Sequence, residues 1–359
     1  MEEENRIAIA MSGGIDSSMA AKMLKDRGFD LIGITMKILP DDTLPSQKHI
    51  VSWMTADIES ARRVCDMLDM PHLIMDLSDS FEEKIIGPFC NAYLEGKTPN
   101  PCIECNKLIK FGLLLQKCRS LSAKYMATGH YCLVEKDNSG QTFKVRKGRD
   151  PLKEQSYFFW KLDQSQLMHI KTPLGAFTKE QIKSRSADLL SLFEGKEESQ
   201  DICFINKDKY QDYLNKRIRK IKKGRILNVK GEYLGDHRGF PYYTIGQRRG
   251  LGISHGEPLY VIKIVPEKNQ IIVGEKEELL RDRACLGDIN FISGKPPSME
   301  FSADVKIRYG SPGVRARIVL EKGNKAIVYF NKNVSSITPG QSAVFYDGDI
   351  LLGGGIITG

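Results

Sequence analysis

The stretch RIAIAMSGGIDSSMAAKMLKDRG, residues 6–28, decides the fold at the beginning of the chain. After Arg6, residues 7–11 form a short apolar run, as in a strand buried inside a sheet. The part after the two glycines predicts a helix, because Met19, Met23 and Leu24 fall on one side and Gly28 stands where the helix would end. A strand, a glycine turn and a helix in this order predict the first unit of an α/β domain.

The same alternation of strands and helices continues through about the first 200 residues. Strand-like segments lie at 31–38, 71–77 and 124–130, and helix-like segments lie at 56–70 and 106–121. Because these strands are continuous apolar runs, we expect a parallel sheet that is covered by helices on both faces. In such a sheet, ligands bind at the carboxyl ends of the strands.

The character of the chain changes after about residue 204. Residues 207–225 contain nine Lys or Arg against two Asp, which indicates either a solvated helix with a linker or a contact with nucleic acid. Short alternating runs separated by glycines follow, as is typical of all-β domains. We therefore expect an α/β domain over 1–206, a small β-rich domain over 207–280 and a β-barrel over 281–359.

The composition sets limits on location and chemistry. The net charge of +8 favours phosphate-bearing partners if the charges cluster, although solubility alone would also explain it. The acidic N-terminus does not resemble a signal peptide, and no apolar run reaches transmembrane length. We therefore expect a cytoplasmic protein. In that compartment the eight cysteines are reduced, and a special cysteine serves catalysis or metal binding.

The turn after the first strand has the features of a pyrophosphate cradle. Gly13 and Gly14 allow the backbone to approach an anion closely, and the helix that follows adds N–H groups and a positive dipole. Asp16 would oppose an anion, unless it caps the helix or helps to hold a magnesium ion that the nucleotide carries. Three serines offer hydroxyl groups nearby: Ser12, Ser17 and Ser18.

Two other phosphate-binding patterns do not fit. A G-x-x-x-x-G-K-[ST] loop that ends at Gly96, Lys97 and Thr98 would need a glycine where the chain has Asn91. The dinucleotide pattern G-x-G-x-x-G is absent from the first turn.

A second motif, NPCIECN at residues 100–106, places two cysteines at the start of a predicted helix. Three interpretations stay open on local grounds. The pair could be half of a zinc site, but such a site needs four ligands and the chain has only one C-x-x-C. It could be a thioredoxin-like redox pair. It could also provide a nucleophile, because a helix N-terminus lowers the pKa of a thiol.

The glycine turn resembles that of the PP-loop ATP pyrophosphatases, which cleave ATP between the α and β phosphates and adenylate an oxygen of the substrate. An ordered series of segments also resembles the bacterial tRNA-specific 2-thiouridylases, over essentially the whole chain. The segments are SGGIDSS, GITMKI, GKTPNPCIECNKLIKFG, MATGHY, KEQSYFFW, DICFI, YYTIGQRRGLGI, IRYGSPGVRAR and GGGII. Any one of them could arise by chance, whereas the ordered set is specific.

This resemblance implies roles for individual residues. The ATP-contacting positions would be Ala10, Met11, Ser12, Gly13, Gly14, Ile15, Asp16, Ser17, Met36 and Gly129. The catalytic residues would be Cys105 as nucleophile, Cys203 as persulfide carrier and Asp16 in the adenylation step. The segment that meets the target base would be Asn100, Pro101 and Cys102. Further tRNA contacts would come from His130, Lys153, Glu154, Gln155, Arg308, Tyr309 and Gln341.

The resemblance also implies a reaction, in which sulfur is installed at ring position two of the wobble uridine of tRNA. The reaction would use ATP with Mg²⁺ and a persulfide from a sulfur-relay protein or a cysteine desulfurase, without a membrane partner. Adenylation converts a poor leaving group, the uridine oxygen, into a good one. A second thiol then breaks the sulfur–sulfur bond by exchange, which leaves a Cys105–Cys203 disulfide.

One position departs from the family pattern, because many members have Asp where this chain has Cys102. An iron–sulfur cluster held by Cys102, Cys105 and Cys203 is therefore an alternative to the persulfide. Two other functions also stay open. One is a PP-loop enzyme that adenylates a small molecule, and the other is an RNA-binding protein whose cysteines are incidental.

Overall fold

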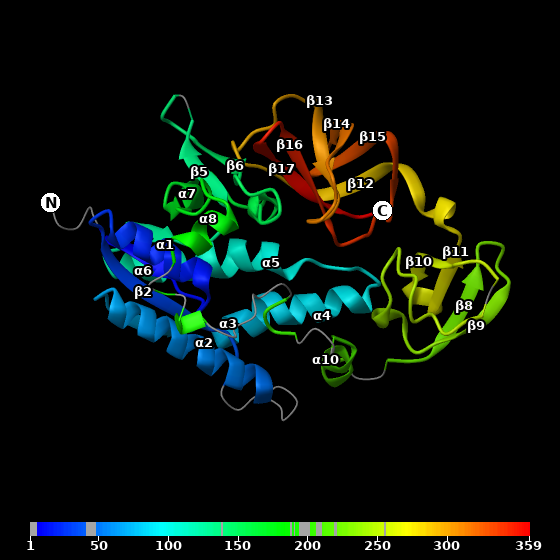
Figure 1. The fold of residues 1–359 in the computed structure, drawn as a ribbon. Helices are drawn as coiled ribbons and strands as arrows, with labels where there is room; N and C mark the ends of the chain where they lie inside the picture. Colours follow the sequence, from blue (N-terminus) through cyan, green and yellow to red (C-terminus); the bar gives the residue numbers. More distant parts are fainter. Residues whose placement is uncertain are drawn as a thin grey trace.

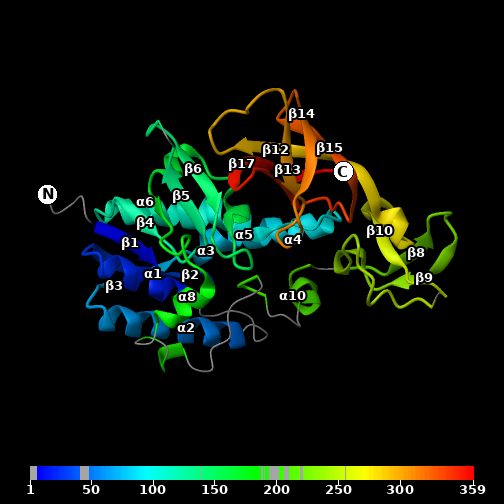
Figure 2. The same cartoon turned by 45° about the horizontal axis from the view of Figure 1, so that its top comes forward.

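The computed structural model describes residues 6–40, 48–137, 139–186, 189, 191–193, 202–205, 210–218, 221–254 and 256–359. An α/β part carries the N-terminal half, a small β-rich part forms one end of the molecule, and a barrel lies beside both (Figures 1 and 2). The expected order of these architectures is confirmed. The domain boundary after residue 206 lies outside the described residues, and both boundaries stay predictions.

The first sheet is parallel and has the strand order β3-β2-β1-β4-β7. Its strands are β1 (Arg6–Ala10), β2 (Asp30–Lys37), β3 (His72–Asp76), β4 (Tyr125–Ala127) and β7 (Ile170–Lys171). Residues 7–9 of the central strand β1 are almost completely buried, as the apolar run predicts. The strand order reverses between β1 and β4, which is where ligands bind in sheets of this kind.

Helices surround this sheet and carry the chain between its strands. They are α1 (Ile15–Lys25), α2 (Lys48–Met67), α3 (Ser78–Phe81), η3 (Glu82–Ile86), α4 (Gly87–Leu94), α5 (Pro101–Glu104), η4 (Cys105–Leu114), α6 (Leu115–Ser120), η5 (Ser156–Phe159), α7 (Gln164–Leu167), α8 (Lys179–Ser184) and η6 (Ser191–Phe193). The helix predicted over 106–121 is present, but η4, Cys105–Leu114, is π-helical. In a π-helix the hydrogen bonds join residues five apart, so such residues lie one turn above another.

The small β-rich part follows α10 (Tyr210–Arg217) and contains a four-stranded sheet in the order β10-β11-β8-β9. Its strands are β8 (Gly224–Asn228), β9 (Tyr233–His237), β10 (Tyr260–Val265) and β11 (Gln270–Gly274), with the short helices η7 (Phe240–Tyr242) and η8 (Pro266–Lys268). Residues 207–209 and 219–220 of the basic stretch lie outside the described residues.

The C-terminal part is a closed barrel with the strand order β12-β15-β14-β13-β16-β17, because β12 also pairs with β17. After η9 (Lys276–Leu279), its strands are β12 (Leu280–Phe291), β13 (Glu300–Lys306), β14 (Val314–Glu321), β15 (Lys325–Ser335), β16 (Ser342–Asp347) and β17 (Ile350–Ile357). A hairpin from the α/β part, β5 (Cys132–Lys136) and β6 (Phe143–Lys147), extends the barrel sheet through β17. The sequence did not predict this hairpin.

The barrel is docked on the α/β part through the segment KEQSYFFW. The hydroxyl of Tyr157 donates to the carbonyl of Ser342 at 2.9 Å, and the amide of Asn290 donates to the carbonyl of Trp160 at 2.7 Å. The Trp160 side chain is completely buried. Because buried aromatic groups contribute most to such interfaces, we expect the two parts to move as one unit. Within the described part of the chain, no helix is both long and apolar enough to cross a membrane.

Candidate active site

The glycine turn lies at the carboxyl end of β1 and leads directly into α1. Gly14 is the N-cap of α1, and no side chain caps the helix. Gly13 has a φ of 72°, and a Cβ atom placed there would lie 2.2 Å from the carbonyl oxygen of Asp57 in α2. A residue with a side chain does not fit at position 13, so the turn stays narrow and its backbone stays close to any bound group.

Two of the three serines named above donate hydrogen bonds within the turn itself. The hydroxyls of Ser17 and Ser18 both donate to the carbonyl of Gly14 at 3.0 Å, and both residues are buried. Ser12 is exposed, and its backbone N–H donates to the Ser17 hydroxyl oxygen at 3.2 Å. The hydroxyls of Ser17 and Ser18 therefore stabilise the first turn of the helix.

Asp16 does not cap α1, so that part of the expectation is wrong. Its Oδ1 atom accepts a hydrogen bond from the Tyr131 hydroxyl at 2.7 Å and pairs with Nζ of Lys179 at 2.6 Å. Tyr131 follows β4 closely, and Lys179 is the first residue of α8. Two distant segments thus hold the carboxylate at the N-terminus of α1.

The carboxyl ends of three neighbouring strands surround the turn. Ala10 ends β1, Met36 lies near the end of β2, and Gly129 follows β4. A Cβ atom on Gly129 would lie 2.8 Å from the backbone of Asp16 and Ser17, so only glycine leaves this approach open. A concave backbone surface at an uncapped helix N-terminus fits the phosphates of a nucleotide. Ile15, the first residue of α1, and Met11, which follows β1, complete the predicted ATP-contacting set.

The second motif begins a helix, as predicted. The side chain of Asn100 accepts a hydrogen bond from the backbone N–H of Cys102 at 3.2 Å, and Pro101 occupies the first helical position. Both residue types favour these positions, because the capping side chain satisfies a free N–H and proline has none to satisfy. This helix, called the cysteine helix below, runs through α5 and η4 and carries Cys102 in α5 and Cys105 at the start of η4.

Burial is the largest influence on the pKa values of these thiols. Burial raises the pKa of the Cys105 thiol to about 11 and also raises the pKa of Cys102. Cys203 is exposed as a residue, yet burial of its thiol raises its pKa as well. The expectation of a lowered thiol pKa is therefore wrong, because loss of hydration on burial is the largest influence on all three thiols. At neutral pH the three groups are neutral thiols.

The structure brings the three predicted cysteines into one cluster. Cys105, and more weakly Cys102, add to the raised pKa of Cys203, and Cys102 adds to that of Cys105. The positive charge of Lys110 opposes burial at all three thiols. Lys110 lies five residues after Cys105 in η4, which is one π-helical turn. All eight cysteines are unpaired.

Within the described residues, no group of three or more His, Cys, Asp or Glu side chains is arranged to hold a metal ion. The three thiols are thus near each other without forming a ligand set in this state.

Residues 129–131 join the glycine turn to the cysteine helix. Gly129 contacts the backbone of α1, and Tyr131 donates to Asp16. Between them, His130 packs against Phe111 of η4 and Phe159 of η5, with ring centroids 6.0 and 5.0 Å apart. Burial and then Lys110 hold the pKa of His130 well below its usual range, so the imidazole is neutral. One short segment therefore contacts both halves of the candidate site.

The predicted tRNA contacts of the α/β part lie beside those of the barrel. The ring of Tyr309 packs against Phe158 at a centroid distance of 4.6 Å and is partly exposed, and Arg308 beside it is exposed. Lys153 is partly exposed, whereas Glu154 is buried and pairs with Lys306 at 3.8 Å. The side chain of Gln155 accepts from the backbone N–H of Tyr131. The side chains of Glu154 and Gln155 are therefore engaged within the protein.

Gln341 also has a partner within the protein. Its amide donates to the carbonyl of Thr98 at 2.9 Å, and the backbone N–H of Thr98 donates to the carbonyl of Pro339 at 2.8 Å. The hydroxyl of Thr98 reaches that of Thr244 in the β-rich part at 3.4 Å. Thr98 lies three residues before Pro101, the first residue of the cysteine helix, so all three parts of the molecule meet next to the start of that helix.

Sequence reasoning missed four residues of this arrangement: Thr98, Lys110, Tyr131 and Lys179. The capping box that starts α8, in which the side chains of Thr178 and Gln181 each bond the other residue's backbone N–H, was a readable signal for a helix beginning at Lys179. Nothing in the sequence points that helix at Asp16. Lys110 could have been found only by knowing that the helix is π-helical.

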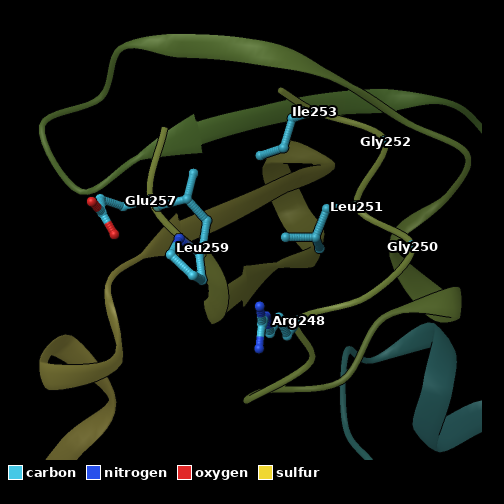
Figure 3. Close-up of a pocket in the computed structure, with 8 residues that line it drawn as sticks. Arg248, Gly250, Leu251, Gly252, Ile253, Glu257 and Leu259 are labelled. Atoms are coloured by element: carbon cyan, nitrogen blue, oxygen red, sulfur yellow. The ribbon is translucent and has the colours of Figure 1, made fainter. Parts of the chain in front are cut away.

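A pocket of about 250 Å³ lies in the β-rich part (Figure 3). It is lined by Arg248, Gly250, Leu251, Gly252, Ile253, Glu257, Pro258 and Leu259. None of these residues belongs to the predicted ATP, thiol or tRNA sets, so this pocket is separate from the candidate site.

Comparisons with known proteins agree with the order of the parts. Family models match residues 5–207 (tRNA methyl transferase HUP domain), 211–275 (tRNA methyl transferase PRC-barrel domain) and 281–357 (aminomethyltransferase beta-barrel domain). Among solved structures, a U34-tRNA thiolase of Methanococcus maripaludis with its [4Fe-4S] cluster matches at 15% identity and a TM-score of 0.33. The match covers 58% of this chain and 63% of that one, and a likeness this low transfers nothing.

Two full-length relatives are much closer. The tRNA-specific 2-thiouridylase MnmA of Moorella thermoacetica is 42% identical over 350 residues, covering 97% of this chain and 98% of the relative. The tRNA-specific 2-thiouridylase MnmA 2 of Thermoanaerobacter sp. is 43% identical over 361 residues, covering 99% of each. The chain therefore belongs to the tRNA-specific 2-thiouridylase family.

Proposed function

We propose that this protein is a tRNA-uridine 2-sulfurtransferase that thiolates the wobble uridine at the expense of ATP, through an adenylated uridine and a persulfide on Cys203. The observation that carries the proposal is the segment 129–131. It contacts the N-terminus of α1 through Gly129 and Tyr131, and the cysteine helix through His130. A nucleotide in the turn and a base near the thiols would therefore share one site.

The glycine turn supplies the first half of the chemistry. The N-terminal N–H groups of α1 and the narrow backbone at Gly13 would bind the phosphates of ATP. Asp16 is the carboxylate that would hold Mg²⁺, which neutralises phosphate charge when it is bound. The uridine oxygen O2 attacks the α-phosphorus, pyrophosphate leaves, and the oxygen becomes part of a good leaving group.

The cysteine cluster supplies the second half. The terminal sulfur of a Cys203 persulfide attacks ring carbon C2, and AMP departs with the original uridine oxygen. The sulfur–sulfur bond that remains is broken by Cys105, whose sulfur bonds to that of Cys203 and leaves the other sulfur on the uridine. A cellular dithiol then reduces the Cys105–Cys203 disulfide. A sulfur-relay protein or a cysteine desulfurase would load Cys203, which is exposed as a residue although its thiol is buried, and the burial of Cys105 protects it from other oxidants.

The target base would have to leave its stack in the anticodon loop, which RNA loops allow. His130 offers a neutral ring between two phenylalanines beside the cysteine helix. Arg308, Tyr309 and Lys153 lie at the junction with the barrel and could hold the RNA backbone and a stacked base.

The proposal is tested by incubating the full chain with Mg-ATP, a persulfide source and unmodified tRNA, followed by mass spectrometry of the nucleosides. We expect 2-thiouridine at the wobble position, and its absence under all conditions would contradict the function. Iron and acid-labile sulfide are measured in the same preparation, purified without air. An active, iron-free enzyme supports the persulfide, whereas activity that follows iron content supports a cluster held by Cys102, Cys105 and Cys203.

A further inference from the structure

A partly buried ion pair lies at the first turn of α1, next to the glycine turn. Nζ of Lys179 lies 2.6 Å from Oδ1 of Asp16, and the same oxygen accepts from the hydroxyl of Tyr131 at 2.7 Å. The Lys179 side chain is only 9% exposed, whereas that of Asp16 is 35% exposed. Lysine is rarely buried without a charged partner, so this contact accounts for its position.

The position of Lys179 is fixed from both sides along the backbone. Its N–H donates to a carboxylate oxygen of Asp150 at 2.8 Å, and Thr178 before it forms the capping box that begins α8. Its ammonium group also lies 6.0 Å from the centre of the Tyr131 ring. These contacts hold the ammonium group of Lys179 beside the Asp16 carboxylate.

An unbalanced carboxylate at this place would repel a triphosphate. Asp16 belongs to the first turn of α1, the same turn whose N–H groups would bind the phosphates. Charges a few ångströms apart in a partly buried site interact strongly, because little water screens them. A neighbouring cation cancels this repulsion and leaves the helix dipole free to attract phosphate.

We propose that Lys179 is the positioning residue of the nucleotide site, which holds and neutralises Asp16 so that the glycine turn accepts a triphosphate. This inference rests on the proposed use of ATP. Lys179 acts through Asp16 and not on the reacting atoms. Tyr131 shares the task as a neutral second donor, so its loss has a smaller effect.

The test is a double-mutant cycle on ATP affinity, measured by calorimetry on the full chain with MgCl₂ and without tRNA. We expect Lys179→Met to weaken ATP binding by about 10- to 100-fold, which is the scale of one lost charge pair at a partly buried site. Adding Asp16→Asn to Lys179→Met should restore affinity at least tenfold, because the unbalanced carboxylate is removed. In the wild-type chain the same Asp16→Asn change removes the carboxylate that would hold Mg²⁺, so ATP affinity should fall there instead of rising, and the opposite signs in the two backgrounds measure the coupling.

Two further variants separate positioning from a general effect on folding. Lys183→Met removes a lysine from the exposed side of α8 and should leave ATP affinity unchanged. Tyr131→Phe should weaken ATP binding only about two- to fivefold. If Lys179→Met does not fold, Lys179→Gln enters the same cycle, and unfolding temperatures are recorded for every variant.

Each result either supports or overturns the proposed role of Lys179. Equal effects of Asp16→Asn in the two backgrounds, or unchanged ATP affinity in Lys179→Met, would overturn the role of Lys179 while the proposed function stands. A wild-type chain that does not bind ATP would instead overturn the proposed function.

Discussion

The glycine turn and the cysteine helix solve opposite physical problems within one site. The turn is polar and uncapped, with its one carboxylate neutralised by Lys179, so it is ready for an anion before any arrives. The cysteine helix is apolar around its thiols, and burial keeps those thiols protonated. The first region is organised for binding, and the second is held unreactive.

This difference indicates how the enzyme avoids wasting sulfur. A thiolate near an exposed surface would react with any oxidant, whereas a buried neutral thiol does not. Lys110 opposes the effect of burial at all three thiols, so a modest change around it would lower their pKa values together. We expect tRNA and ATP to supply that change when they close the site.

The Cys203→Ser variant should separate the role of the cysteine cluster from that of the glycine turn most clearly. It should lower the yield of 2-thiouridine by at least about 10³-fold, because the sulfur carrier is lost, while tRNA-dependent adenylation continues. Nucleoside mass spectrometry and the release of pyrophosphate measure the two steps. The control is Cys285→Ser, which removes another exposed cysteine, from barrel strand β12. Normal thiolation by Cys203→Ser would mean that the sulfur carrier lies elsewhere.

The protonated state of the cysteine helix predicts a strong pH dependence in the free protein. With a pKa of about 11, the thiolate fraction of Cys105 rises tenfold for each pH unit below that value. Alkylation of Cys105 should therefore accelerate about 100-fold between pH 8 and pH 10. Peptide mass spectrometry with iodoacetamide follows the modification. A rate that is already at its plateau at pH 8 would show that the thiol is ionised and that burial does not govern it.

Gly129→Ala should disturb the glycine turn selectively, because Gly129 belongs to the segment 129–131 that contacts both the turn and the cysteine helix. The new Cβ atom would lie 2.8 Å from the backbone of Asp16 and Ser17, so the N-terminus of α1 must move. We expect ATP affinity to fall at least about tenfold while thiol reactivity changes little. Gly256→Ala is the matched control, because a Cβ atom there meets nothing within 4 Å. Equal ATP binding in both variants would refute a close nucleotide at Gly129.

The smallest expected effect concerns the joint between the barrel and the cysteine helix. Gln341→Ala removes the hydrogen bond to Thr98 and should lower kcat about three- to fivefold at saturating tRNA, since one hydrogen bond contributes about 1 kcal/mol. Steady-state kinetics with varied tRNA provide the measurement. A rise in KM for tRNA at constant kcat would instead identify Gln341 as an RNA contact alone.

The two regions also differ in how far the sequence predicts them. The turn depends on neighbours in the chain, so Gly13, Gly14 and the start of α1 could be predicted from local rules. Asp16 was expected either to cap the helix or to help hold a magnesium ion. Its pairing with Lys179 was not predicted, because Lys179 lies 163 residues away and no local rule connects them.

The sequence predicted the position of the cysteine helix, but it did not predict that the thiols on this helix are protonated. Proline and asparagine at its start indicate the helix, and the C-x-x-C pattern indicates special chemistry. The pKa of a thiol depends on how much protein surrounds it, which only the tertiary structure determines. The β5–β6 hairpin, which extends the barrel sheet, was missed for the same reason, because its strand β6 pairs with β17 some 200 residues later.

The most direct test of a shared site follows one oxygen atom through the reaction. Unmodified tRNA is prepared with ¹⁸O at position O2 of the wobble uridine and reacted in a single turnover with ATP and a persulfide source. If ATP adenylates the same uridine that receives the sulfur, AMP should carry one ¹⁸O atom for each 2-thiouridine formed. Unlabelled AMP alongside 2-thiouridine would contradict it, because the nucleotide would then have been cleaved without reacting with the base that receives the sulfur.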